Sequence, residues 1–151
     1  MTVKVIDHGL DKLMRETHEL ASLEIASGIL PKNFDDAYDN GMTVGEAVII
    51  QTYGTSKIPA RDFMGGTADA YREKAGQVMQ TQAEKVMDGT LTPAAAAEEL
   101  GKWFHGRINA HIDNGPWARN AASTIRKKGR DEPLKDTKKL YNAIDHEVRK
   151  K

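Results

Sequence analysis

The chain has 151 residues, with 22 Lys and Arg, 22 Asp and Glu and no cysteine, so its formal net charge at pH 7 is zero. This length suffices for one domain with a sizeable core, and the absence of cysteine excludes a disulfide framework and a thiolate metal site. The sequence has no apolar run of the roughly 18 residues that a membrane helix needs, and its first residues do not form an apolar signal core. We therefore expect no membrane contact.

The first thirty residues predict a strand, a helix and a second strand. Residues 2–6 alternate between polar and apolar side chains, as a short strand does. Residues 9–22 carry apolar side chains at spacings of three and four, which predicts an amphipathic helix with one buried stripe. Residues 23–30 return to a two-residue period and predict another strand. This order favours a helix laid across a small sheet.

The next segment, residues 31–42, is acidic, polar and rich in turn-forming residues. We expect an acidic loop over 31–42, inside a single domain that spans residues 1–151. A solvated insertion is the simpler interpretation, and contact with a basic patch on a neighbouring molecule is the alternative. Thr43 and Glu46 then have the spacing of a capping box, which predicts a helix from this point to about Thr52.

The middle of the chain predicts two long helices. Pro59 biases its predecessor toward the β region, so we expect residues 58–64 to be extended. A Gly-Gly pair then opens a helix over residues 67–87. Thr92 caps a second helix with proline in its first turn, and this helix runs to Asp113. Two long helices joined by a short turn predict an antiparallel hairpin.

The last quarter of the chain carries a one-sided charge. Residues 117–151 hold 11 of the 22 basic residues but only 5 of the 22 acidic ones, a net charge of +6. The remaining residues hold 11 basic and 17 acidic side chains, a net charge of −6. The neutral total therefore conceals a dipolar chain.

The predicted elements of this quarter complete the fold. Residues 121–128 predict a short helix capped by Asn120, and Asp136 or Thr137 is expected to cap a further helical turn. Residues 143–150 alternate as a final strand, which we place against the early strands because a lone strand leaves its backbone unpaired. The predicted fold class is α+β: a small antiparallel sheet, made of the N-terminal strands plus the C-terminal strand, packed with a long antiparallel helical hairpin.

The sequence contains no pattern that predicts catalysis. His105 and His111 lie on one predicted helix but are six residues apart, roughly 240° around the axis, so they cannot chelate a metal as an i, i+4 pair does. No spacing to an acidic residue marks the remaining histidines, which are His8, His18 and His146. No elbow or triad pattern surrounds the candidate nucleophiles, which are Ser56, Ser123 and Thr124. We predict no enzyme, no metal site and no cofactor.

A basic cluster is the strongest remaining signal. Arg126, Lys127, Lys128 and Arg130 fall within five residues. Three interpretations of this cluster are open. It is a solvated face, it contacts DNA phosphates without regard to base sequence, or it contacts an acidic surface of an adjacent subunit. Trp117 follows a glycine-proline turn, where it either caps the core or anchors a subunit interface.

Two blocks of motifs carry a family resemblance. The first is Tyr53-Gly54-Thr55 followed by Ile58-Pro59-Ala60-Arg61-Asp62-Phe63-Met64. The second comprises Gly115-Pro116-Trp117, Ser123-Thr124-Ile125-Arg126-Lys127-Lys128-Gly129 and Pro133-Leu134-Lys135-Asp136-Thr137-Lys138-Lys139-Leu140. In this order they resemble the bacteriophage tail-completion proteins, also called neck or virion morphogenesis proteins, over roughly residues 43–148. Asp62 stands where members of that family usually have proline, and Lys138 where many have glycine.

The resemblance implies a structural protein of the virion, at the junction of the phage head and tail. It implies a homo-oligomeric ring, commonly six-fold, that joins head and tail and lets genome DNA pass through its lumen without sequence-specific contact. The implied neighbours are head-completion, tail-terminator or tail-tube proteins, and the implied location is the virion neck or tail, with host cytoplasm during assembly. The alternatives are a small basic-tailed nucleic-acid-binding regulator and a tail-assembly chaperone that does not stay in the virion.

Candidate interface residues come from both motif blocks and the basic cluster. We expect these residues to lie at subunit boundaries: Ile58, Pro59, Arg61, Phe63, Trp117, Arg126, Lys127, Lys128, Arg130, Pro133, Leu134, Asp136 and Thr137.

Overall fold

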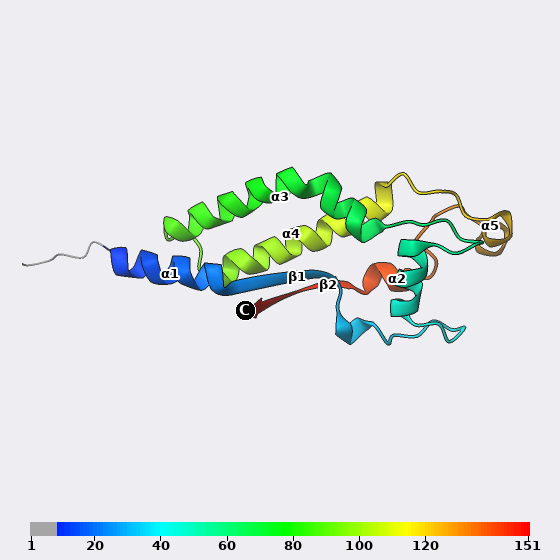
Figure 1. Cartoon of the computed structure of the whole chain (residues 1–151), viewed down its shortest axis with the longest axis horizontal. Helices are drawn as coiled ribbons and strands as arrows, with labels where there is room; N and C mark the ends of the chain where they lie inside the picture. Colours follow the sequence, from blue (N-terminus) through cyan, green and yellow to red (C-terminus); the bar gives the residue numbers. More distant parts are fainter. Residues whose placement is uncertain (1–8) are drawn as a thin grey trace, which may run out of the picture.

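A computed structural model describes residues 9–151 of the chain (Figure 1). The predicted strand at residues 2–6 lies outside the described residues. The described elements are, in order, α1 (Leu10–Ser22), β1 (Leu23–Ile29), the 3-10 helix η1 (Pro31–Asn33), α2 (Val44–Tyr53), α3 (Phe63–Met87), α4 (Pro93–Asn114), α5 (Ala122–Lys128), α6 (Lys139–Asn142) and β2 (Ile144–Lys150). The fold is α+β, as predicted.

The described sheet consists of two antiparallel strands, β1 and β2. Leu23 pairs with Lys150 and Ile29 pairs with Ile144, so the C-terminal strand covers the whole of β1. This pairing confirms the prediction that the last strand returns to an early one. It also brings residues more than a hundred positions apart into one ladder.

The two long helices form the predicted antiparallel hairpin, and α4 lies between α3 and the sheet (Figure 1). Thr92 caps α4 by accepting a hydrogen bond from the N–H of Ala95, with Pro93 in the first turn. α4 buries Leu100, Ile108 and Ile112, together with small residues that allow close approach. None of the described helices is long and apolar enough to cross a membrane.

The first long helix begins earlier than predicted. Residues 58–64 were expected to be extended, but α3 starts at Phe63. The reason is the Asp62 carboxylate, which accepts a hydrogen bond of 2.8 Å from the N–H of Gly65 and caps the helix. The two glycines therefore lie inside the first turn, where Gly66 allows the ring of His111 to approach the backbone.

The first helix forms as predicted, but its apolar stripe is not buried. α1 has no buried residue, and Met14 is 61% exposed. Leu23 is already extended at the C-cap, so α1 continues the line of β1 past the hairpin turn instead of crossing the sheet (Figure 1). Only part of its surface meets the ends of α3 and α4.

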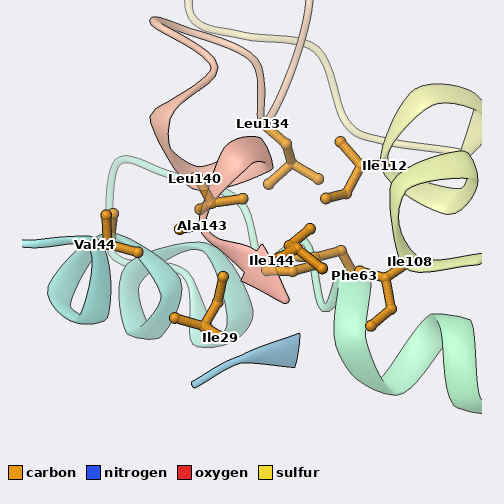
Figure 2. Close-up of a cluster of buried hydrophobic side chains, with 10 residues drawn as sticks. Ile29, Val44, Phe63, Ile108, Ile112, Leu134, Leu140, Ala143 and Ile144 are labelled. Atoms are coloured by element: carbon orange, nitrogen blue, oxygen red, sulfur yellow. The ribbon is translucent and has the colours of Figure 1, made fainter. Parts of the chain in front are cut away.

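The main core lies at the other end of the molecule, where α2, the start of α3 and the end of α4 meet the sheet. Figure 2 shows its buried apolar side chains, which are Ile29, Val44, Ala47, Phe63, Ile108, Ile112, Leu134, Leu140, Ala143 and Ile144. α2 is held by the predicted capping box, in which Thr43 and Glu46 exchange hydrogen bonds. This core supports the loops that carry the candidate interface.

Two predicted helix caps near the C-terminus are wrong. α5 begins after Ala121 without a side-chain cap, because the Asn120 side-chain oxygen faces the Arg61 guanidinium at 3.4 Å. α6 begins after Lys138, which has no side-chain cap and a left-handed backbone, so neither Asp136 nor Thr137 occupies the cap position. A tertiary contact thus decides the first of these positions. The further helical turn is α6, which ends at Asn142 because Ile144 already pairs with Ile29 in the sheet.

Candidate interface at the basic end of the chain

Arg61 joins the two motif blocks. Its guanidinium donates hydrogen bonds to the carbonyl oxygen of Ala118 from Nε (3.0 Å) and Nη2 (2.9 Å), and to that of Arg119 from Nη2 (3.2 Å). Nη1 donates to Oε1 of Gln51 at 3.0 Å. Arg61 is only 4% exposed, and this burial lowers the pKa of its guanidinium while the charge of Asp131 opposes the shift. The residue therefore fastens the segment after Trp117 to the segment before α3.

Trp117 packs against the core of its own chain. Its indole Nε1 donates a hydrogen bond of 2.9 Å to the carbonyl oxygen of Ile112, and its ring meets that of His111 edge-on at a centroid distance of 5.1 Å. A side chain at Gly115 would collide with the indole, because a Cβ there would lie 2.4 Å from it. Trp117 therefore caps the core of its own chain, and its role as the anchor of a subunit interface stays a prediction.

The Lys128 side chain is held by hydrogen bonds within the chain and does not belong to a free charged surface. Its ammonium donates hydrogen bonds to the carbonyl oxygens of Glu132 (2.9 Å) and Lys135 (2.6 Å). Burial lowers the pKa of Lys128, and the nearby carboxylate of Asp136 partly offsets that effect. Gly129 ends α5 with a φ of 73°, so the chain can turn back toward this ammonium.

The other basic side chains of the cluster divide into paired and unpaired groups. Arg130 lies 2.6 Å from the carboxylate of Glu132 and donates to the carbonyl oxygen of Asp136 at 3.1 Å. Arg126 and Lys127 are exposed on α5, and neither forms an ion pair with any residue from 9 to 151. These two side chains are therefore the available cations of the cluster.

A carboxylate ties the start of this region to its turn. Asp131 accepts a hydrogen bond of 2.7 Å from Nε of Arg119 and one of 3.0 Å from the backbone N–H of Asn120. Both bonds hold the pKa of Asp131 below its usual range, and the bond from Arg119 has the larger effect. The extended segment 116–121 and the turn after α5 are thus joined to each other.

Leu134 is held in an unusual backbone conformation by the core. Its φ is 64°, in the left-handed region, and its side chain is 8% exposed. Such a conformation costs about 1–3 kcal/mol in a residue with a side chain, and it persists only where the surroundings impose it. Burial of the leucine among Ile112, Leu140 and Phe63 supplies that constraint (Figure 2).

A pocket of about 440 Å³ lies between the basic cluster and the acidic loop. Its lining includes the apolar side chains of Met42, Leu134 and Leu140. Around them lie polar groups of both charges, namely Asp39, Asp136, Lys127, Lys128, Lys135 and Lys139. Apolar side chains and groups of both charges therefore share this one pocket.

The acidic loop contacts its own chain. Nδ2 of Asn33 donates a hydrogen bond of 2.8 Å to the carbonyl oxygen of Ala143, and the ammonium of Lys32 lies 2.6 Å from the carboxylate of Asp145. Lys139 donates to the carbonyl oxygen of Ala37 and lies over the ring of Tyr38. Sequence reasoning missed these contacts, since nothing in the local pattern links residues a hundred positions apart.

The structure brings the predicted interface residues to one end of the molecule but divides them into two groups. Arg61, Phe63 and Leu134 are buried inside the chain and position the rest. Trp117, Lys128, Ile58 and Pro133 are half-buried. The exposed members, which can contact another molecule directly, are Pro59, Arg126, Lys127, Arg130, Asp136 and Thr137.

Comparison with models of protein families, with curated proteins and with solved structures finds no match to this chain.

Proposed function

We propose that this chain is a structural virion protein of the phage head-tail junction, where it forms a ring that joins head and tail and lets DNA pass. The observation that carries the proposal is the contact between the two motif blocks. Arg61 of the first block is buried against Ala118 and Arg119, which directly follow Gly115-Pro116-Trp117 of the second. Motifs that lie more than fifty residues apart therefore form one physical unit.

The two departures from the family pattern also support the proposal. Asp62, where relatives usually have proline, has a φ of −73°, close to the value of about −65° that proline imposes. Its N–H donates no hydrogen bond within residues 9–151, so a proline would remove only the side-chain cap that the Asp62 carboxylate gives to α3. Lys138, where many relatives have glycine, has a φ of 61°, in the region that favours glycine. At both positions the backbone is one that the family residue adopts readily.

A head-to-tail ring requires a different surface on each side of a subunit. The basic cluster supplies one candidate surface through Arg126 and Lys127. Residues 1–116, which carry a net charge of −6, supply acidic groups for the other. Complementary charge steers subunits together and sets their orientation. In this proposal the neighbours are head-completion, tail-terminator or tail-tube proteins, and the chain acts through interfaces, without catalysis.

Charge reversal on α5 tests the proposal. The double variant Arg126→Glu/Lys127→Glu changes two exposed side chains, whereas Arg72→Glu/Lys74→Glu makes the same charge change on the exposed face of α3. We expect the wild-type chain and the α3 variant to form rings, and the α5 variant to remain at the monomer mass of 16.7 kDa in size-exclusion chromatography with light scattering. Electron microscopy of the wild-type particle provides the ring symmetry.

An α5 variant that forms the same ring as wild type would remove the basic cluster from the interface. A wild-type chain absent from purified virions by mass spectrometry would favour the tail-assembly chaperone instead.

The alternative function is a nucleic-acid-binding regulator, and the unpaired cations Arg126 and Lys127 are the observation that favours it. A gel shift with short duplexes over a salt series separates the two functions. A regulator binds such duplexes tightly, and its affinity falls steeply with salt. A ring component shows weak binding or none.

A further inference from the structure

A group of polar side chains lies where α4 faces β2. Glu98 and His105 come from α4, and Asp145 and His146 come from the beginning of β2. Gly101 lies between the two α4 residues on the same face of the helix, and a Cβ at this position would lie 2.3 Å from Cδ2 of His146. The missing side chain lets the imidazole of His146 lie directly on the helix.

The hydrogen bond of His146 determines which of its nitrogens is free. Nε2 lies 2.9 Å from Oε1 of Glu98. A carboxylate only accepts, so Nε2 is the donor in this hydrogen bond and Nδ1 is the ring nitrogen left for a further partner. Nδ1 is buried and has no hydrogen-bond partner among residues 9–151, and the side chain as a whole is 13% exposed.

A carboxylate oxygen faces this nitrogen. Oδ1 of Asp145 lies 4.0 Å from Nδ1 of His146. The ammonium of Lys32 lies 2.6 Å from Oδ2, the other oxygen of this carboxylate. Oδ1 also accepts a hydrogen bond of 2.8 Å from the backbone N–H of His146, and its second lone pair is left for a cation shared with Nδ1.

His105 completes the group. Its ring lies 6.2 Å from that of His146, centroid to centroid. One ligand atom from each of His105, Asp145 and His146 lies within 4.8 Å of the other two. Two imidazoles and one carboxylate are the ligands that Zn²⁺ and similar transition-metal dications accept, with the remaining position open to water.

We propose that His105, Asp145 and His146 bind a transition-metal dication such as Zn²⁺, and that Glu98 is the positioning residue that orients His146. A ring nitrogen held by a carboxylate is the usual arrangement behind a metal-bound histidine. Small side-chain rotations bring the three atoms to the metal, at distances of about 2.0–2.2 Å. Lys32 is 62% exposed and can keep its contact with the outer oxygen of Asp145 or move into solvent.

The metal would cross-link the helical hairpin to the C-terminal strand. This role is separate from the ring interface, because α4 and β2 lie away from α5 (Figure 1). It also revises the expectation of no metal site, which considered only spacings along the chain.

Zinc titration of the full-length chain, stripped with EDTA and followed by isothermal titration calorimetry, tests the proposal. We expect one equivalent of Zn²⁺ to bind the wild-type chain and raise its melting temperature by several degrees. His105→Gln abolishes both effects, and Glu98→Gln weakens zinc affinity roughly 10- to 100-fold. Co²⁺ in place of zinc reports the ligand set through its visible absorption.

His18→Gln is the matched control, since His18 is exposed on α1, and it keeps wild-type binding. His105 carries the test because it is only half-buried, so its variant keeps the fold, which circular dichroism verifies. A wild-type chain that binds no zinc, or a folded His105→Gln chain that binds zinc as tightly as wild type, overturns the proposal.

Discussion

The two ends of this elongated molecule are stabilised in different ways. At the end that holds α1 and the hairpin turn, the elements are regular but the apolar surface is thinly covered, and Met14 and Met87 are more than half exposed. At the opposite end long loops connect shorter helices, and the main core around Phe63 lies there (Figure 2). The core side chains themselves come mostly from helices and strands, so the loops of this end are stabilised by packing onto a core that regular elements provide.

The difference shows what holds an irregular segment in place. The loops of the core end are fastened by side chains that donate to backbone carbonyl groups, above all Arg61, Lys128 and Trp117. Helices and strands satisfy their own backbone groups, whereas loops need such donors once they are packed on a core. The candidate interface is built on these loops, so its shape depends on a few polar residues.

Loss of the Arg61 guanidinium should have the largest effect. We expect Arg61→Met to destabilise the fold by about 2–4 kcal/mol, because several acceptors lose their donor at a buried site. Arg61→Lys should recover only part of this loss, since an ammonium cannot reach Gln51 and Ala118 together in the same fork geometry. Urea denaturation followed by circular dichroism measures both variants. If Arg61→Met unfolds at the same urea concentration as wild type, the loops are held by the core alone.

Substitutions at two glycines of α4 test how closely this helix packs against β2. Gly101→Ala places a Cβ against the ring of His146, so we expect a loss of about 1–3 kcal/mol from overpacking. A Cβ at Gly106 would meet nothing within 4 Å, so Gly106→Ala should raise helix stability by up to about 1 kcal/mol. Thermal unfolding of the two variants side by side makes the comparison. Equal effects would show that α4 and β2 pack less closely than described.

Replacement of Lys138 by glycine should have a smaller effect on the free energy of unfolding, and this effect should be stabilising. Glycine adopts a φ of 61° without strain, so Lys138→Gly should stabilise the chain by about 0.5–1 kcal/mol. Lys127→Gly makes the same substitution inside α5 and should cost about 1 kcal/mol. Chemical denaturation distinguishes the two signs. Destabilisation at both positions would contradict a left-handed residue 138.

The pH dependence of the core end should report on Asp131. Arg119 and the N–H of Asn120 lower the pKa of this carboxyl group in the folded state. Its contribution to stability is therefore complete above the unfolded value of about 3.9 and is lost as the pH falls through the lower folded value. The stability difference between wild type and Asp131→Asn should shrink over that range. A difference that stays constant down to pH 2 would show that the carboxylate is not engaged.

Local patterns in the sequence predicted most of the elements. The capping box at Thr43 and the Thr92-Pro93 start of α4 are confirmed, because each depends on hydrogen bonds within one helical turn. The C-terminal strand is also confirmed, since an unpaired strand requires a partner. The start of α3 was predicted four residues late, because the side chain of Asp62 outweighs the extended preference around Pro59.

The candidate site was predicted only in part. Sequence motifs indicated Arg61, Phe63 and Leu134 as interface residues, but their burial depends on contacts with segments fifty or more positions away. The same holds for Trp117, whose two interpretations differ only in what packs against the indole. Sequence alone does not contain that information, because side chains are buried by the whole fold and not by their neighbours along the chain.

The amino-acid sequence by itself determined the fold class, the hairpin, the charge asymmetry and the segments that form the basic end, all of which follow from propensity, periodicity and composition. Tertiary structure alone decided that Arg61 joins the two motif blocks, that α1 is left partly uncovered, and that His105, Asp145 and His146 come together. The physical reason is that the register of β1 with β2 and the packing of α4 set the distances between residues far apart in the chain.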